Sequence, residues 1–176
     1  GGKSLTYQVP ALVMDGICLV VTPLIALMKD QISRLNSLEI KSMAIHSGMS
    51  QEEIDIALDN CIYGDYKFLY ISPERIATRI FQTRLPRLNL NLVAIDEAHC
   101  ISEWGHDFRP SYLRVKDVRQ RLGAPPTVAL TATATPEVRE DIARQLALHD
   151  PALVLTGFDR TNLSYHVIAV KNDAAK

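Results

Sequence analysis

The sequence predicts an α/β fold in which a parallel sheet is flanked by helices on both faces. Short apolar runs recur along the chain with polar residues at their ends, which is typical of strands buried on both faces. Segments with helical patterns separate these runs, and strands that alternate with helices indicate a parallel sheet. The chain has 176 residues and 47% hydrophobic content, enough for one domain with a sizeable core.

The first predicted element is a helix over residues 5–14, directly after Gly1-Gly2-Lys3-Ser4. The apolar runs predict strands at residues 17–22, 42–45, 68–71, 92–95, 127–131 and 152–155. The helical patterns between them predict helices near residues 24–38, 50–62, 73–80, 112–122 and 136–146. We expect residues 1–156 to form one domain. Residues 157–163 are typical of a linker, and 164–170 predict the first strand of a following domain.

Two of these helices have well-marked starts. Ser50 and Glu53 form a capping-box pattern, in which each side chain bonds to the other residue's backbone N–H. Thr135 precedes Pro136, so an N-capping hydroxyl is followed by proline at the first helical position, where the missing N–H does no harm. Helices are therefore expected to begin at these two points.

Composition excludes some classes of protein. Cys18, Cys61 and Cys100 are odd in number and widely spaced, which favours reduced thiols over a disulfide framework or a zinc site. No stretch is long and apolar enough to span a bilayer, and no signal-peptide pattern opens the chain. We expect an intracellular protein without a membrane partner, with a bacterial cytoplasm favoured and a nucleus as the alternative. The net charge of −1 gives no reason by itself to propose nucleic acid as a partner.

The tetrapeptide Asp96-Glu97-Ala98-His99 follows the apolar run 92–95 and places two acids at the carboxyl end of a buried strand. Ligands of parallel sheets collect at these strand ends. A carboxylate at Asp96 can hold Mg²⁺, and Glu97 can orient a water for attack on a terminal phosphate. A solvated acidic turn is the alternative interpretation.

Gly1-Gly2-Lys3-Ser4 matches the second half of a phosphate-binding loop. In the full pattern, backbone N–H groups cradle phosphates, the lysine reaches the outer phosphates and the hydroxyl binds Mg²⁺. The earlier glycine of that pattern and its preceding strand do not occur in the sequence. Together with the acidic tetrapeptide, this segment predicts a Mg²⁺-nucleotide site with Lys3, Ser4 and Asp96 in it.

Small hydroxyl residues follow three further predicted strands. The segments are Thr22-Pro23-Leu24, Ser72-Pro73-Glu74-Arg75 and Thr131-Ala132-Thr133-Ala134-Thr135. Hydroxyls and free N–H groups at helix starts can contact phosphate oxygens of a nucleotide or of a nucleic-acid backbone. Ordinary helix capping is an equally good explanation for a single Ser or Thr, but capping does not require the repeated threonines of the third segment.

The loop over residues 99–112 differs in composition from the rest of the chain. It contains the only Trp, and its candidate functional residues are His99, Trp104, His106, Phe108 and Arg109. Trp104 or Phe108 could stack on bases and Arg109 could grip phosphate. The alternative is an aromatic loop that folds back over the core, which is a serious possibility for Trp104.

Taken together, these motifs resemble the first RecA-like motor domain of a superfamily 2 helicase, and of the RecQ family of DNA helicases in particular. The resemblance rests on the segments above, with Tyr7-Gln8, Leu27-Met28, Asp30-Gln31, Tyr70-Ile71, Phe158-Asp159-Arg160 and Asn162-Leu163. DEAD-box RNA helicases have the nucleotide motifs but no counterpart of the loop 99–112.

The resemblance implies 3′-to-5′ unwinding of duplex DNA in recombination or repair, driven by ATP with Mg²⁺. It implies that Gly1, Gly2, Lys3, Ser4, Asp96 and Thr131 bind the nucleotide, with Ser4 and Asp96 on the metal. Lys3, Asp96 and Glu97 would be catalytic, and His99 and His106 would couple the site to DNA. Residues implied to contact DNA are Thr22, Pro23, Ser72, Arg75, Trp104, Phe108, Arg109 and Thr133.

The sequence also departs from the RecQ pattern. The strand before the phosphate loop, the adenine-recognising glutamine motif, the second RecA-like domain with its arginine fingers, and the zinc-binding and winged-helix regions do not occur in it. We therefore expect the chain alone to be an inactive fragment, with a gap in its sheet that residues 164–170 or a neighbouring chain could fill. An RNA helicase, or a nucleotide-dependent nucleic-acid-binding module that does not unwind, remains the alternative function.

Overall fold

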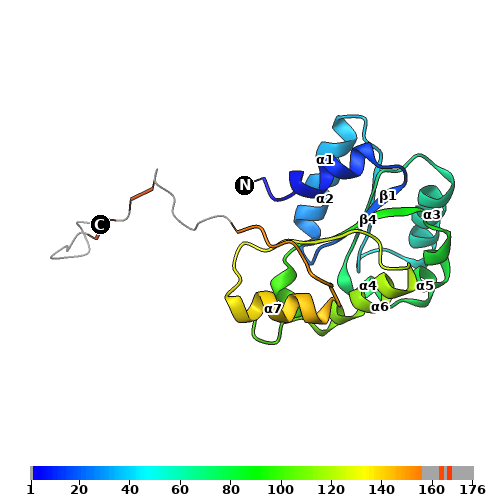
Figure 1. The fold of residues 1–176 in the computed structure, drawn as a ribbon. Helices are drawn as coiled ribbons and strands as arrows, with labels where there is room; N and C mark the ends of the chain where they lie inside the picture. Colours follow the sequence, from blue (N-terminus) through cyan, green and yellow to red (C-terminus); the bar gives the residue numbers. More distant parts are fainter. Residues whose placement is uncertain (1, 156–162, 165, 168–176) are drawn as a thin grey trace.

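The computed structural model describes residues 2–155 together with residues 163, 164, 166 and 167 (Figure 1). Gly1 lies outside the described residues, as do most of the predicted linker and most of the predicted strand over 164–170. No helix in the described part of the chain has the length and apolar character needed to cross a membrane.

A five-stranded sheet forms the centre of the fold, with the strand order β2-β3-β1-β4-β5. Every neighbouring pair is parallel, as the alternation of apolar runs and helices predicted. The strands are β1 (Ile17–Val21), β2 (Ser42–Ile45), β3 (Phe68–Ile71), β4 (Leu90–Ile95) and β5 (Thr127–Ala129). The carboxyl ends of all five strands therefore lie along the same side of the sheet, and the candidate site lies at these strand ends.

Helices cover both faces of this sheet, and each face has its own apolar core (Figure 1). On one face, α1 (Leu5–Val13) and α2 (Ile25–Ser37) pack through Tyr7, Ala11 and Met28 on alternate strand residues such as Val20. The larger core on the other face lies beneath α3 (Gln51–Tyr63), α4 (Pro73–Ile76), α5 (Arg79–Arg84), α6 (Arg114–Arg121) and α7 (Pro136–Gln145). The predicted two-sided α/β arrangement is confirmed.

The two marked helix starts are also confirmed. At Ser50 both bonds of the capping box form: the Glu53 backbone N–H donates to the Ser50 hydroxyl at 3.2 Å, and the Ser50 N–H donates to the Glu53 carboxylate at 2.7 Å. At α7, the Thr135 hydroxyl accepts from the Val138 N–H at 3.4 Å, with proline at the first position. Local sequence chemistry thus determines where these helices begin.

Other predicted boundaries differ from the structure. The helix expected over 73–80 is two short helices, α4 and α5, and the one expected over 112–122 begins as the 3₁₀ helix η3 (Pro110–Leu113) before α6. Further 3₁₀ helices are η1 (Leu85–Arg87) and η2 (Ala98–Ile101). The strand expected over 127–131 ends at Ala129, because the hydroxyl of Thr131 bonds to the backbone of Thr133 and curls the chain.

The strand predicted over residues 152–155 is wrong. These residues are exposed and pair with no strand, and Val154 is 86% exposed. An apolar run forms a strand only where it pairs with a neighbouring strand, and residues 152–155 pair with none of the five strands of the sheet. Ser164, His166 and Val167 are exposed and in no strand either, so the expectation that 164–170 fills the gap is wrong for its described residues.

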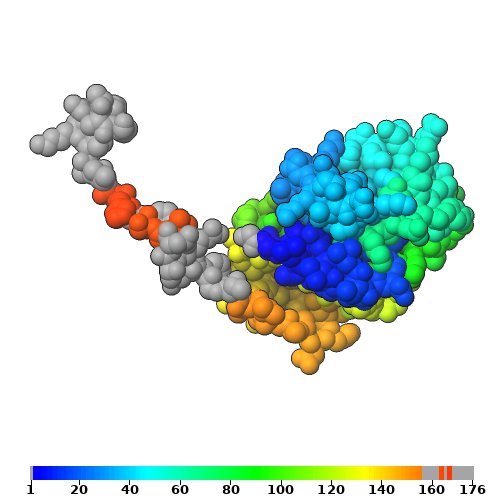
Figure 2. All heavy atoms as spheres, turned by 90° about the horizontal axis from the view of Figure 1, so that it is seen from above, coloured from blue at the N-terminus to red at the C-terminus, as the bar shows by residue number. Residues whose placement is uncertain are grey.

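The outer face of α1 is uncovered in the described part of the molecule. Figure 2 shows this helix at the surface, and Leu5, Val9 and Val13 all have exposed side chains. Only the inner residues of the helix, Tyr7 and Ala11, are buried.

Candidate active site

The ends of the central strands bring distant segments together at one edge of the sheet. Val21, at the end of β1, lies in register with Ile71 of β3 and Ile95 of β4. The ladder continues one residue further, because the Asp96 N–H donates to the Val21 carbonyl at 2.9 Å and the Thr22 N–H donates to the Ile71 carbonyl at 3.1 Å. The residues that follow each strand therefore share one edge.

Lys3 meets both acids of the tetrapeptide at this edge, although 94 residues separate it from Glu97. Its Nζ donates to Glu97 Oε1 at 2.8 Å and lies 3.7 Å from Asp96 Oδ1. Asp96 is buried and Glu97 is half-buried. The sequence prediction that these segments are two halves of one site is consistent with this geometry, and a solvated acidic turn is not.

Glu97 has a strained backbone, with φ 48° and ψ 46° in the left-handed region. Such a conformation is rare for a residue with a side chain and is found preferentially at functional sites. Its N–H donates to Asp96 Oδ1 at 3.0 Å, which fixes one carboxylate relative to the other. The strain and this bond hold both acids toward Lys3.

Burial raises the pKa of Asp96 above its usual range, the Lys3 ammonium opposes this shift, and the Glu97 carboxylate adds to it. A partly desolvated acid beside a second acid is stabilised by a cation. Lys3 supplies one positive charge here. The same pair of carboxylates suits a divalent cation such as Mg²⁺, which prefers oxygen ligands.

The phosphate-loop segment has the backbone that an anion site requires. Gly2 has φ +97°, which a residue with a side chain would adopt only with strain, and nothing lies within 4 Å of the position of a Cβ. Ser4 immediately precedes α1, and its hydroxyl caps no N–H of that helix. The helix N-terminus, Lys3 and the Ser4 hydroxyl can therefore serve phosphate and Mg²⁺.

A series of close polar contacts leads from Glu97 toward the third threonine segment. Glu97 Oε2 lies 3.4 Å from His99 Nδ1, and this nitrogen is 2.9 Å from the Thr131 hydroxyl. The Thr131 hydroxyl in turn accepts from the Thr133 N–H at 3.2 Å. Burial lowers the pKa of His99, with the Glu97 carboxylate opposing the shift, so a neutral ring that can pass on hydrogen-bond changes is favoured.

The loop over 99–112 is fixed close to the acids. The His106 ring stacks on His99 with centroids 4.4 Å apart, and the buried Tyr112 hydroxyl donates to the Asp96 carbonyl at 3.0 Å. The Arg109 N–H donates to the Cys100 carbonyl at 2.8 Å, which closes the loop. A movement of this loop would therefore reach the backbone of Asp96.

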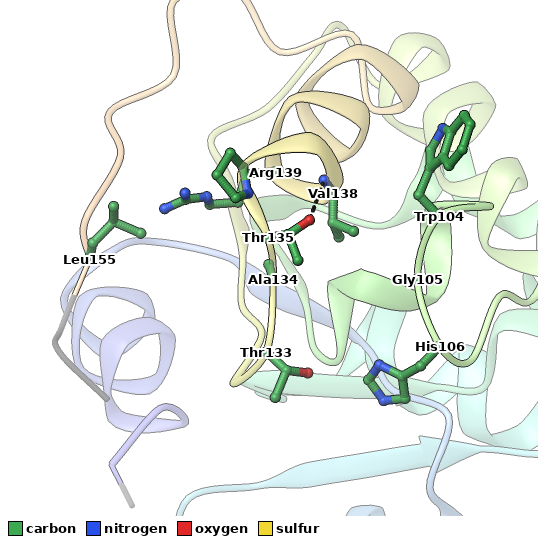
Figure 3. A pocket seen from close by; sticks show the side chains of 10 residues that line it. Trp104, Gly105, His106, Thr133, Ala134, Thr135, Val138, Arg139 and Leu155 are labelled. Atoms are coloured by element: carbon green, nitrogen blue, oxygen red, sulfur yellow. Dashed lines mark hydrogen bonds between the residues drawn. The ribbon is translucent and has the colours of Figure 1, made fainter. Parts of the chain in front are cut away.

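Trp104 does not cover the core, because it is 76% exposed. With Gly105 and His106 it forms one side of a pocket of about 670 Å³, whose other side includes Thr133 and Arg139 (Figure 3). Phe108 is half-buried. The Arg109 guanidinium is paired with Asp107, through Nε at 3.2 Å and Nη2 at 3.0 Å, so it would have to exchange partners to grip phosphate.

The remaining predicted nucleic-acid contacts are less accessible. Thr22 and Ser72 are buried, and their hydroxyls have no hydrogen-bond partner among the described residues. Pro23 is half-buried. Arg75 donates from Nε to the His46 carbonyl at 3.1 Å and from Nη2 to two further carbonyls, so it supports the backbone that precedes α3.

Sequence reasoning assigned no role to Asp107, Tyr112 or Arg139. Asp107 holds Arg109, Tyr112 holds the backbone of Asp96, and Arg139 lines the pocket. Tyr112 is the last residue of the loop predicted from the sequence, but nothing in the sequence could show where its hydroxyl points. Arg139 lies in a helix whose spacing predicted only packing.

Comparisons with known proteins agree with this site. The family model described as "DEAD/DEAH box helicase" matches residues 1–142, and the chain belongs to that family. This class of motor domain implies that the site uses ATP. Within the family, the chain matches RecQ helicases over nearly its whole length, as the first motor domain of such an enzyme.

The ATP-dependent DNA helicase RecQ of Bacillus subtilis is 47% identical over 98% of this chain, which covers 29% of that protein. The ATP-dependent DNA helicase Q5 of mouse is 46% identical over 94% of this chain and 18% of that protein. The chain thus spans less than a third of either relative. Among solved structures, the Hef helicase domain of Pyrococcus furiosus superposes with a TM-score of 0.64 at 22% identity, covering 83% of this chain and 31% of that one. The RecA-like fold is confirmed.

Proposed function

We propose that the chain is the nucleotide-binding motor domain of an ATP-dependent DNA helicase that unwinds duplex DNA in the 3′-to-5′ direction, in recombination or repair. The observation that carries the proposal is the convergence of Lys3 on Asp96 and Glu97, with a series of close polar contacts from Glu97 through His99 to Thr131 and the segment beside the exposed Trp104. A nucleotide site and a nucleic-acid surface are linked here within one domain.

Each residue of the site would have its own role in ATP binding and hydrolysis. Lys3 would move from Glu97 to the outer phosphates of ATP when the nucleotide binds, which frees the Glu97 carboxylate to orient the attacking water. Ser4 and Asp96 would hold Mg²⁺, which supplies charge stabilisation for the transferred phosphoryl group. Gly2 and, beyond the described residues, Gly1 would approach the phosphates through their backbone N–H groups.

The nucleic-acid side is proposed to begin at the pocket in Figure 3. Trp104 is free to stack on a base, and Thr133 lies across the pocket from it. Contact there would reach Glu97 through Thr131 and His99, and would reach Asp96 through the loop and Tyr112. DNA binding would thereby adjust the catalytic acids.

We further propose that this chain needs the rest of its enzyme for turnover. An arginine contributed by a second motor domain is worth about 10³–10⁵ in rate in related phosphoryl-transfer enzymes. A strand before the phosphate loop would pair with β5, which is one of the two edge strands of the sheet. Residues 1–176 alone are therefore expected to show no DNA-stimulated turnover, and turnover at the rate of the complete enzyme would refute this.

The proposal is tested by unwinding assays on the complete enzyme with duplexes that carry a 3′ or a 5′ single-stranded tail. We expect ATP-dependent strand separation from the 3′-tailed duplex only, and none with Glu97→Gln. Unwinding of RNA duplexes in preference to DNA would support the RNA helicase alternative. ATP-dependent DNA binding without strand separation would support a module that does not unwind.

A further inference from the structure

A polar cluster lies between α1, α2 and the sheet on one face of the fold. It consists of Tyr7 on α1, Gln31 on α2 and Tyr70 on β3, with Gln8 at its edge. The two tyrosines are 1% and 0% exposed and pack within an apolar cluster, and the two glutamines are half-buried. Packing alone would be served by phenylalanine at both positions, so the hydroxyls call for an explanation.

Gln31 is the centre of this cluster. Its Oε1 accepts from the Tyr7 hydroxyl at 2.7 Å and from the Tyr70 hydroxyl at 2.9 Å. Gln8 Nε2 donates to the Tyr70 oxygen at 3.2 Å, so this hydroxyl both accepts and donates. Burial raises the pKa of both tyrosines, which keeps them protonated as donors. One amide oxygen thus joins α1, α2 and β3.

Each joined segment leads to a different part of the proposed machinery. Tyr7 lies one turn after Ser4, whose carbonyl accepts from the Tyr7 N–H at 3.3 Å and the Gln8 N–H at 3.0 Å. Helix α2 begins directly after the segment that contains Thr22 and Pro23, and β3 ends one residue before Ser72. The cluster therefore connects the phosphate-loop helix to the two segments that contain Thr22 and Ser72, the buried residues for which the RecQ resemblance implies a place beside DNA.

We propose that Gln31 is a positioning residue that couples nucleotide binding to nucleic-acid binding. The proposal rests on the proposed function. A displacement of α1 when Lys3 and Ser4 engage phosphate pulls on Tyr7, and Gln31 transmits it to α2 and β3. Buried hydrogen-bonded clusters are suited to this role because a missing partner leaves a donor unsatisfied, so the elements move together or not at all. By linkage, nucleic acid must change nucleotide affinity by the same factor.

The test measures the coupling factor in the complete enzyme. Affinity for fluorescent single-stranded DNA is measured with and without a non-hydrolysable ATP analogue, and the ratio of the two dissociation constants is the coupling factor. We expect Gln31→Leu to bring this ratio to within about twofold of unity, from the about 5–150-fold that is usual for allosteric coupling. The affinity for DNA in the absence of nucleotide stays unchanged.

Two variants separate positioning from simple packing. Gln31→Glu keeps an acceptor oxygen for both tyrosines and is expected to retain the coupling factor. The double variant Tyr7→Phe with Tyr70→Phe removes both donors, leaves the half-buried amides of Gln8 and Gln31 to pair with each other and with solvent, and is expected to lose the coupling factor. Gln120→Leu makes the same chemical change on an exposed position of α6 and serves as the control.

The outcomes distinguish the two proposals. If the unmodified enzyme shows no nucleotide-dependent DNA binding and no DNA-stimulated hydrolysis, the proposed function fails. If the unmodified enzyme is coupled and the double phenylalanine variant keeps its full coupling factor while folded, the role of Gln31 is overturned. The double variant also decides the matter if Gln31→Leu fails to fold.

Discussion

At the scale of a single residue, we propose that Glu97 carries the chemistry of the site. Its left-handed backbone and its bond to Lys3 favour the proposal that its carboxylate orients a water, while the adjacent Asp96 would hold the metal. The proposed roles differ because the surroundings of the two acids differ: Asp96 is buried, and Glu97 is half-buried in contact with Lys3 and His99.

Glu97→Gln keeps the shape of the side chain and removes its ability to accept a proton. In the complete enzyme we expect ATP affinity to stay within a few-fold of the unmodified value, and hydrolysis to fall by about 10²–10⁴-fold, the usual contribution of a general base. Equilibrium binding of a fluorescent ATP analogue and single-turnover hydrolysis separate the two quantities. Near-normal hydrolysis by this variant would assign the base elsewhere.

His99 gives the domain a pH dependence of stability. Its pKa in the folded chain lies below the ordinary histidine value of 6.5, because burial disfavours the charged ring. Between the two pKa values the unfolded chain binds more protons, so stability rises with pH through this window and is lost as pH falls below 6.5.

We expect His99→Gln to flatten the pH dependence of the free energy of unfolding below about pH 6.5, as measured by urea denaturation. His149→Gln, at an exposed position, is the control and should leave the curve unchanged. An unchanged slope in the His99 variant would mean that its ring is not held neutral by the fold.

At the scale of an element, the loop between η2 and η3 depends on a close approach that only glycine permits. A Cβ at Gly105 would meet the His99 carbonyl at 2.4 Å and the Ser102 carbonyl at 3.1 Å. Because both contacts are backbone atoms, a larger residue must displace the loop. The loop position can thus be changed without removing any side chain that we propose to contact DNA.

Gly105→Ala and Trp104→Ala form a matched pair on this loop. Trp104 is exposed, so its removal opens no cavity in the core and should leave thermal stability unchanged. In the complete enzyme both variants are expected to lose most of the stimulation by single-stranded DNA, and Trp104→Ala, which removes an exposed side chain without displacing the loop, is expected to keep basal ATP hydrolysis. Full stimulation in both would show that the loop is structural.

Element boundaries show what sequence patterns can and cannot predict. The strand cores and the starts at Ser50 and Thr135 were predictable, because apolar runs and caps act through neighbours in sequence. The curl at Thr131 and the unpaired run 152–155 were not. The first depends on hydrogen bonds between Thr131 and Thr133, and the second on whether a neighbouring strand is present.

At the scale of the whole molecule, the parallel sheet brings motifs that are far apart in sequence together in one site. Lys3, Asp96 and Glu97 were predictable as partners, because parallel strands end at one edge and both motifs belong at that edge. The contact of Tyr112 with Asp96 and the proposed role of Gln31 were not predictable. Both depend on which backbone or side chain the fold brings next to these residues. Long-range hydrogen bonds leave no local pattern.

Our central proposal is that DNA bound in the pocket beside Trp104 stimulates ATP hydrolysis. The most direct measurement is steady-state ATP hydrolysis by the complete enzyme without nucleic acid, with single-stranded DNA and with single-stranded RNA of the same sequence. We predict strong stimulation by DNA, little by RNA, and loss of the DNA effect in Trp104→Ala. Equal hydrolysis in all three conditions would contradict the account, and stimulation by RNA alone would replace DNA with RNA as the substrate.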